Sequence, residues 1–191
     1  MMKRILLVYI IMCIPTLKMW AGLKDGEACD DLLQYTPYAA LFTLKACGVD
    51  SRDAWGRFAV TAAASFAVSA GTTYALKNTV REWRPDNSDR RSFPSGHVTI
   101  AFAGATMLHR EYGSVSPWIT VGGYAVATAA AASRLMHDRH HWYDVAAGAA
   151  VGVLGTELTF YLGDRLFPKK HPGSTATVVF TGTGLNVAVA F

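Results

Sequence analysis

The sequence predicts an all-α protein, a bundle of apolar helices embedded in a membrane, with a short tail that resembles a β-hairpin. Residues 58–76 and 116–133 carry no charged side chain, and residues 142–162 carry only two acidic ones. Such runs approach the ~20 residues with which a helix crosses a bilayer. Alanine and glycine are abundant in them, as they are where membrane helices pack closely. Length alone does not separate a membrane span from the buried helix of a compact bundle, so the second interpretation stays open.

Proline, glycine and charge divide the chain into its elements. The first helix is expected over residues 32–46, with an interruption near Pro37 because proline lacks a backbone N–H. The second begins at residue 58 and is stopped by Pro85, which disfavours helix in the residue before it. Residues 86–92 are polar and rich in turn formers, which indicates a loop.

Three further helices and the tail follow this loop. The third helix is expected from Ser95 to about Glu111, where a glycine two residues later helps to stop it. Residues 116–133 and 142–162 form the fourth and the fifth. Residues 175–191 are rich in Thr and Val on both sides of a Gly-containing turn, a pattern typical of a β-hairpin.

The N-terminus has the features of an export signal. Lys3 and Arg4 precede an apolar run over residues 5–14, and Ala21 and Gly22 offer a small residue for cleavage. An uncleaved membrane anchor is the alternative. The predicted organisation is a leader or anchor at residues 1–22, one helical domain at residues 23–168 and a tail at residues 169–191.

Charge and cysteine content narrow the possible functions. The formal net charge is +4, and positive residues concentrate between Lys77 and Arg91. A local cluster argues against nucleic-acid binding, which uses a broad basic face, and it suits a small anionic site. Cys29 and Cys47 are an even pair in an exported chain. Their pairing is left open, because a straight helix between them would separate its ends by ~24 Å.

The first of three charged clusters contains Lys77 and Arg84. A spacing of seven residues places them on one helix face, two turns apart. Arginine offers a planar fork to phosphate oxygens and lysine offers a point charge, so the two side chains can converge on one anion. The alternative is a helix end whose long cationic side chains reach the membrane surface.

The second cluster is Pro94-Ser95-Gly96-His97, ahead of an apolar helix. Ser95 suits an N-cap, Gly96 lets another group approach the backbone, and a helix N-terminus binds phosphate well. His97 lies in the first turn, where it can donate a proton to a leaving oxygen. An ordinary capped helix with an incidental histidine is the alternative.

The third cluster contains Ser133-Arg134, His140 and Asp144. His140 and Asp144 are four residues apart and share a face if they are helical. A carboxylate at that offset can accept the N–H of one imidazole nitrogen and leave the other nitrogen free to attack. Arg134 supplies a second fork for phosphate oxygens. The alternative is a cap of interfacial charge between two membrane spans.

A metal site at His137, Asp138 and His141 is a weaker interpretation of the same segment. Zinc sites usually need three or four ligands with a supporting outer shell. The chain has no Cys ligand pair and no His-Glu-x-x-His sequence. Neither a metal nor another cofactor is therefore predicted.

Together the three clusters contain what an in-line phosphoryl transfer requires. Two arginines, a lysine and a helix N-terminus supply fixed donors for the equatorial oxygens. Two histidines supply a nucleophile and an acid for opposite sides of the phosphorus. In their order and spacings, these residues resemble the three-part signature of the type 2 phosphatidic acid phosphatases, the PAP2 superfamily. The resemblance covers residues 35–167.

The resemblance implies a PAP2-type helical bundle, metal-independent acid phosphatase activity and a role for each residue. His140 would become phosphorylated, Asp144 would orient it, and His97 would protonate the leaving alcohol. The phosphate would be cradled by Lys77, Arg84, Ser95, Gly96 and Arg134. A bell-shaped pH profile is expected, since His97 must be protonated while His140 must be neutral.

Within that family the sequence is most similar to small bacterial lipid phosphatases that act on lipid A or undecaprenyl pyrophosphate. This implies a lipid-linked phosphomonoester or pyrophosphate as substrate, a place in the bacterial inner membrane and an active site that faces the periplasm. Two other interpretations are a vanadium-dependent haloperoxidase, which resembles the same signature but holds vanadate, and an inactive membrane protein.

Overall fold

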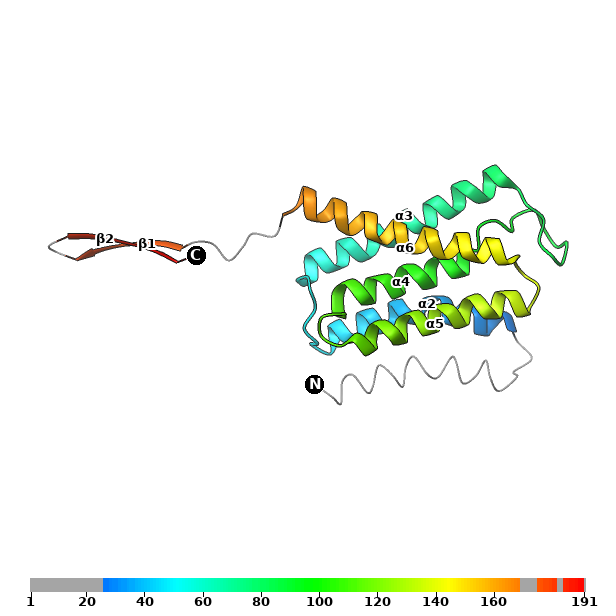
Figure 1. The fold of residues 1–191 in the computed structure, drawn as a ribbon, viewed down its shortest axis with the longest axis horizontal. Coiled ribbons are helices and arrows are strands. Elements are labelled where there is room, and N and C mark those ends of the chain that lie inside the picture. Colours follow the sequence, from blue (N-terminus) through cyan, green and yellow to red (C-terminus); the bar gives the residue numbers. More distant parts are fainter. Residues whose placement is uncertain (1–25, 169–174, 182–183, 191) are drawn as a thin grey trace. The chain divides into compact units, whose positions relative to one another are not determined.

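A computed structural model describes the backbone of residues 26–168, 175–181 and 184–190, and the side chains of residues 31–168 (Figure 1). The predicted leader at residues 1–22 lies outside the described part. The main body is all-α, as predicted. Its helices are α2 (Gly26–Ala46), α3 (Trp55–Val80), α4 (Gly96–Tyr112), α5 (Pro117–Met136) and α6 (Trp142–Leu166).

The helices α2 to α6 form a bundle in which successive helices reverse direction (Figure 1). Helix α4 contacts α2, α3 and α5 and is buried over most of its length. Helix α6 packs closely on α4 at Gly152, where an added Cβ would lie 2.4 Å from the carbonyl oxygen of Thr99. Hydroxyl groups also join the helices, since Ser65 of α3 lies 2.6 Å from Thr156 of α6. Small residues and hydroxyl contacts of this kind are typical of tightly packed membrane helices.

The predicted interruption at Pro37 is wrong, because α2 continues through it. A proline inside a helix removes one hydrogen bond and costs about 3 kcal/mol, so tertiary packing has to offset it. Leu33 and Leu41 are fully buried on either side of Pro37. The side chain of Pro37 also lies against Gly104 of α4, where an added Cβ would approach its Cβ to 2.9 Å. Burial against α4 therefore holds the helix together.

The continuous α2 also answers the question of the cysteine pair. A helix from residue 29 to residue 46 separates its ends by about 26 Å at 1.5 Å per residue, whereas a disulfide needs Cα atoms within ~7 Å. Cys47 follows the last turn and carries a free thiol. An intramolecular bridge to Cys29 is therefore not formed.

The chain divides into two compact units, with the boundary after Phe160. In the second unit, β1 (Thr175–Thr181) pairs with β2 (Gly184–Ala190) in antiparallel register, with Thr175 opposite Ala190. This is the hairpin-like tail that the sequence pattern predicts.

Two of the described helices, α3 and α6, are long and apolar enough to cross a membrane, and in each only 28% of the most apolar window is buried. The core helix of a soluble protein is mostly buried, so the exposure of α3 and α6 favours membrane spans. The uncharged residues 116–133 lie in the helix α5, which is not one of these two candidate spans.

Candidate active site

The reversal of successive helices brings the three charged clusters to one end of the bundle. Lys77 lies in the last turn of α3, and Ser95 occupies the N-cap of α4. Arg134 lies in the last turn of α5, and Asp144 lies in the first turn of α6. His140 belongs to the short connection between α5 and α6. Residues far apart in the sequence therefore lie at one end of the bundle.

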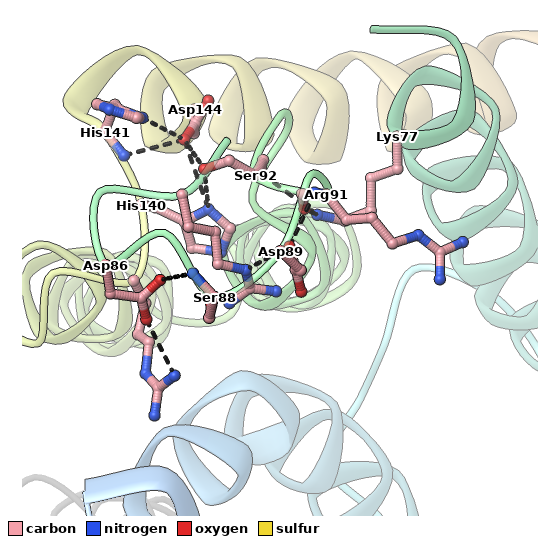
Figure 2. A network of polar contacts seen from close by, with 11 residues as sticks. Lys77, Asp86, Ser88, Asp89, Arg91, Ser92, His140, His141 and Asp144 are labelled. Carbon is pink, nitrogen blue, oxygen red and sulfur yellow. Dashed lines mark hydrogen bonds and ion pairs between the residues drawn. The ribbon is translucent and has the colours of Figure 1, made fainter. Parts of the chain in front are cut away.

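The centre of the site is a buried group of three side chains (Figure 2). The hydroxyl of Ser92 donates a short hydrogen bond to Oδ2 of Asp144. Nδ1 of His140 lies 3.4 Å from the Ser92 hydroxyl and 3.6 Å from Oδ2 of Asp144. All three residues are at most 4% exposed. The imidazole is thus held against a hydroxyl–carboxylate pair.

Asp144 also fixes the start of α6 to the start of α4. Its carbonyl oxygen accepts a hydrogen bond from the backbone N–H of Ser95 at 3.0 Å, and its Oδ2 accepts one from the N–H of His141 at 2.9 Å. Its Oδ1 is buried and has no hydrogen-bond partner within the described residues. The carboxylate is therefore a structural anchor as well as a neighbour of His140.

The two adjacent histidines, His140 and His141, differ in burial and in the charges around them. The ring of His141 also approaches Asp144, with Nδ1 3.4 Å from Oδ2, but its side chain is 34% exposed. It stacks on Tyr143 with ring centroids 5.0 Å apart. His140 is instead buried among the cationic residues, which makes it the better candidate for a group that meets phosphate.

The surroundings of His140 keep its ring neutral. Burial lowers the pKa of His140 to about 3, and the positive charges of Lys77 and Arg134 add to this effect, while the Asp144 carboxylate opposes it. A neutral imidazole has a nitrogen lone pair, which is the form that attacks an electrophile. The same positive charges that lower the pKa are suited to bind an anion at this place.

Lys77 and Arg84, two of the cations predicted to bind phosphate, contact the loop that connects α3 and α4. Nζ of Lys77 donates to the carbonyl oxygens of Arg91 at 2.6 Å and Ser92 at 3.3 Å. Nε of Arg84 pairs with Oδ1 of Asp89 at 3.0 Å. Figure 2 shows Lys77, Arg91 and Ser92 side by side at this edge of the site. Lys77 and Arg84 therefore hold this part of the loop in place.

The start of α4 differs from the prediction in one respect. Ser95 occupies the N-cap position, but its side chain makes no capping hydrogen bond. Its hydroxyl is buried and has no hydrogen-bond partner within the described residues. The backbone N–H of Ser95 instead donates to the carbonyl of Asp144, so Ser95 is part of the α4–α6 contact.

At Gly96 an added Cβ would meet Lys77 and Thr73 only at 3.8 Å, an ordinary contact distance. The buried Ser95 hydroxyl, which has no partner among the described residues, is suited to bind a ligand oxygen.

His97 is positioned by a residue that the sequence did not single out. Its Nε2 lies 2.8 Å from Oδ1 of Asp31 in α2, and the side chain of His97 is 27% exposed. Gln34 donates to the same oxygen of Asp31 at 3.1 Å. The Asp31 carboxylate therefore fixes the orientation of the His97 imidazole. Asp31 and His97 are separated by 66 residues, so no local spacing points to their contact.

The sequence also gives no reason to select Ser92 or Asp89 as site residues. Both lie in a segment whose composition indicates only a turn-rich loop, and Ser92 is 48 residues from the histidine that it contacts. The described residues contain no group of three or more His, Cys, Asp or Glu side chains placed to hold a metal ion.

Comparison with known proteins adds two matches. A family model described as the PAP2 superfamily matches residues 58–168. The chain is 40% identical over 139 residues to a lipid A 1-phosphatase of Porphyromonas gingivalis, an alignment that covers 72% of this chain and 31% of the relative. The chain thus spans about a third of the length of that curated relative. No solved structure matches the chain.

Proposed function

The chain belongs to the PAP2 superfamily, and on this premise we propose that it is a phosphatase that hydrolyses a lipid-linked phosphate ester through a phosphohistidine at His140. The observation that carries the proposal is the buried, neutral His140, which is held by Ser92 and Asp144 and faces the charges of Lys77, Arg84 and Arg134. A neutral nucleophile surrounded by cations is what attack on a phosphate dianion requires.

The reaction is proposed to take place in two steps. First, Nε2 of His140 attacks the phosphorus, the bond from phosphorus to the alcohol oxygen breaks, and His97 gives its proton to that oxygen. Second, water attacks the phosphohistidine, His97 takes the proton of the water, and the nitrogen–phosphorus bond breaks. The products are the lipid alcohol and inorganic phosphate, and both histidines return to their starting forms.

Each remaining site residue has a proposed role at the phosphate. Lys77, Arg84 and Arg134 neutralise the equatorial oxygens, the Arg side chains with their forks and Lys77 with its point charge. The unpartnered hydroxyl of Ser95 and the backbone N–H of Gly96 complete the donors at the helix N-terminus. Arg84 and Lys77 would exchange their present loop contacts for phosphate oxygens.

The proposed substrate is lipid A or a related envelope lipid carrying a phosphomonoester or a pyrophosphate. The name of the Porphyromonas gingivalis relative supports lipid A. The exposed apolar faces of α3 and α6 support a substrate that approaches from a bilayer. The relative does not support the haloperoxidase interpretation or the inactive one.

The proposed location is the bacterial inner membrane, with the site at the periplasmic surface. Helix α3 is about 39 Å long at 1.5 Å per residue, which exceeds the ~30 Å apolar core of a bilayer. Exposed tryptophans mark both ends of the bundle, with Trp55 and Trp118 at one end and Trp83 and Trp142 at the site end. Such aromatic pairs are enriched at both membrane–water interfaces.

Phosphate release by detergent-purified protein tests the proposal. Lipid A, undecaprenyl pyrophosphate and phosphatidic acid are compared as substrates, with EDTA present, for the wild-type chain and for His140→Ala. We expect release that survives EDTA, is fastest with one of the envelope lipids and falls by at least about 10³-fold in the variant, as when a nucleophile is removed.

Two outcomes would overturn the proposal. One is turnover that persists in His140→Ala, and the other is oxidation of bromide by the vanadate-loaded protein with peroxide while no lipid phosphate is cleaved. Soluble phosphate esters serve as the control for the substrate class, and faster cleavage of these esters than of the lipids would refute the lipid assignment.

A further inference from the structure

Ser92 is joined through each of its polar groups to a different part of the site. Its backbone N–H donates to the carbonyl oxygen of Glu82 at 3.0 Å, and its carbonyl oxygen accepts from Nζ of Lys77 at 3.3 Å. Its hydroxyl contacts Asp144 and His140. The residue is fully buried. The backbone of Ser92 thus joins the end of α3 to the site, and its side chain joins the start of α6 to the candidate nucleophile.

The distances favour a contact between Asp144 and His140 that runs through this hydroxyl. Nδ1 of His140 lies 3.6 Å from Oδ2 of Asp144, which is beyond hydrogen-bonding distance. The Ser92 hydroxyl lies 3.4 Å from Nδ1, at the distance of a long hydrogen bond, and it donates a hydrogen bond to the carboxylate. Figure 2 shows Ser92 between the two residues.

The donors and acceptors of Asp144, Ser92 and His140 set the direction of the hydrogen bonds that link them. An ionised carboxylate only accepts, so the single hydroxyl proton of Ser92 points to Asp144. The Ser92 oxygen then has only lone pairs to offer to Nδ1 of His140, which must therefore carry the ring proton. The other ring nitrogen, Nε2, is left unprotonated, and it is the one that can attack.

We propose that Ser92 is the positioning residue through which Asp144 selects the Nδ1-protonated tautomer of His140. The inference rests on the proposed role of His140 as nucleophile, but it concerns a property of the resting protein. Asp144 by itself is too distant to fix the tautomer, and it is also occupied by the N–H of His141. Ser92 supplies the missing acceptor.

Nitrogen NMR of protein labelled with [15N]histidine tests this directly, because protonated and unprotonated imidazole nitrogens resonate far apart. The signals of His140 are assigned by their loss in His140→Gln. In the wild-type chain near neutral pH, we expect Nδ1 protonated and Nε2 unprotonated. In Ser92→Ala, we expect the population to move toward the Nε2-protonated ring, because Nδ1–H has lost its acceptor.

Activity provides the second readout. We expect Ser92→Ala to lower kcat by about 10- to 100-fold, as when a group that orients a metal-bound imidazole is removed, with little change in KM. Ser92→Thr keeps the hydroxyl and should restore the wild-type tautomer and most of the kcat. The matched control is Ser65→Ala, which removes another fully buried serine hydroxyl, bonded to Thr156 away from the site. It should change neither readout.

The outcomes separate this inference from the proposed function. An unchanged His140 tautomer in Ser92→Ala, or an equal loss of kcat in Ser65→Ala, overturns the positioning role. If the wild-type chain cleaves no phosphate, the proposed function fails, while the tautomer still decides the role of Ser92. If Ser92→Ala does not fold, Ser92→Cys replaces it, since a thiol is similar in size but a weak hydrogen-bonding group, and the same tautomer shift is expected.

Discussion

At the scale of single residues, the site depends on a histidine that cannot easily be protonated. His140 is buried beside Lys77 and Arg134, and only the Asp144 carboxylate favours its charged form. The neutral ring is the reactive one, so the cations that attract the substrate also keep the nucleophile ready. Attack through His140 therefore does not require alkaline conditions, and the proton that the leaving alcohol needs must come from elsewhere, in our account from His97.

The burial of His140 has a consequence for stability. Its pKa is lowered to about 3 in the folded chain, against ~6.5 for an exposed histidine. Between these pH values the unfolded chain binds a proton at this residue and the folded chain does not. The free energy of unfolding therefore has its full value above about pH 6.5 and decreases as the pH falls toward 3. We expect Tm in detergent to decrease over this window.

His140→Gln should flatten that decrease, because glutamine has no proton to bind. His109→Gln, at an exposed histidine in α4, is the control for the substitution itself. Equal slopes for the wild-type chain and His140→Gln would contradict the assignment.

The sequence offers candidate site residues but not the contacts between them. Lys77, Ser95 and Asp144 are candidates because their residue types and helical spacings carry a chemical meaning. Ser92 and Asp31 are not, because their partners lie 48 and 66 residues away. Contacts between distant segments depend on how helices pack, which local spacing does not encode.

At the scale of elements, glycine controls how closely α6 can approach α4. An alanine at residue 152 would place its Cβ 2.4 Å from the carbonyl oxygen of Thr99 and 2.9 Å from the nitrogen of Ala103. Both atoms belong to the backbone, so the helices would have to separate. We expect Gly152→Ala to lower the free energy of unfolding by about 1–3 kcal/mol, as overpacking usually does.

Gly71→Ala is the matched control in denaturant unfolding experiments. Gly71 is also helical, but an added Cβ meets nothing within 4 Å. Alanine in a helix is favoured over glycine by roughly 0.5–1 kcal/mol, so this variant should be as stable as the wild-type chain or more stable. A similar loss in both variants would show that the α4–α6 contact is not the cause.

Packing also explains why one element differs from its prediction. The sequence places Pro37 inside a helix and therefore predicts a break, because local rules count only the lost hydrogen bond. The absence of a side chain at Gly104 lets α2 approach α4 closely at this point. The other helices end near their predicted limits, since turn residues and charges mark their ends in the sequence itself.

At the scale of the whole molecule, the bundle presents apolar surface on α3 and α6 and places its polar site at one end. Leu154 lies in the middle of α6 and is exposed, whereas Arg90 lies in the loop at the site and is also exposed. In a membrane these two positions would meet lipid and water, respectively. In a soluble protein both would meet water.

Cysteine labelling separates these two environments. Leu154→Cys and Arg90→Cys are prepared in a chain whose three natural cysteines are replaced by serine, and intact spheroplasts are treated with a membrane-impermeant maleimide. We expect rapid labelling at residue 90 and labelling at residue 154 only after denaturation. Labelling at both positions would exclude the bilayer, and labelling at residue 90 only after permeabilisation would place the site on the cytoplasmic side.

The most direct test of the central claim is to trap the phosphorylated enzyme. Protein mixed with a substrate labelled in its phosphate is quenched in alkali within one turnover, since the nitrogen–phosphorus bond of phosphohistidine survives alkali and is lost in acid. We expect label on the peptide that contains His140, in the wild-type chain and in His141→Ala, and none in His140→Ala. Label on His141, or rapid turnover with no labelled protein at any time, would contradict the account.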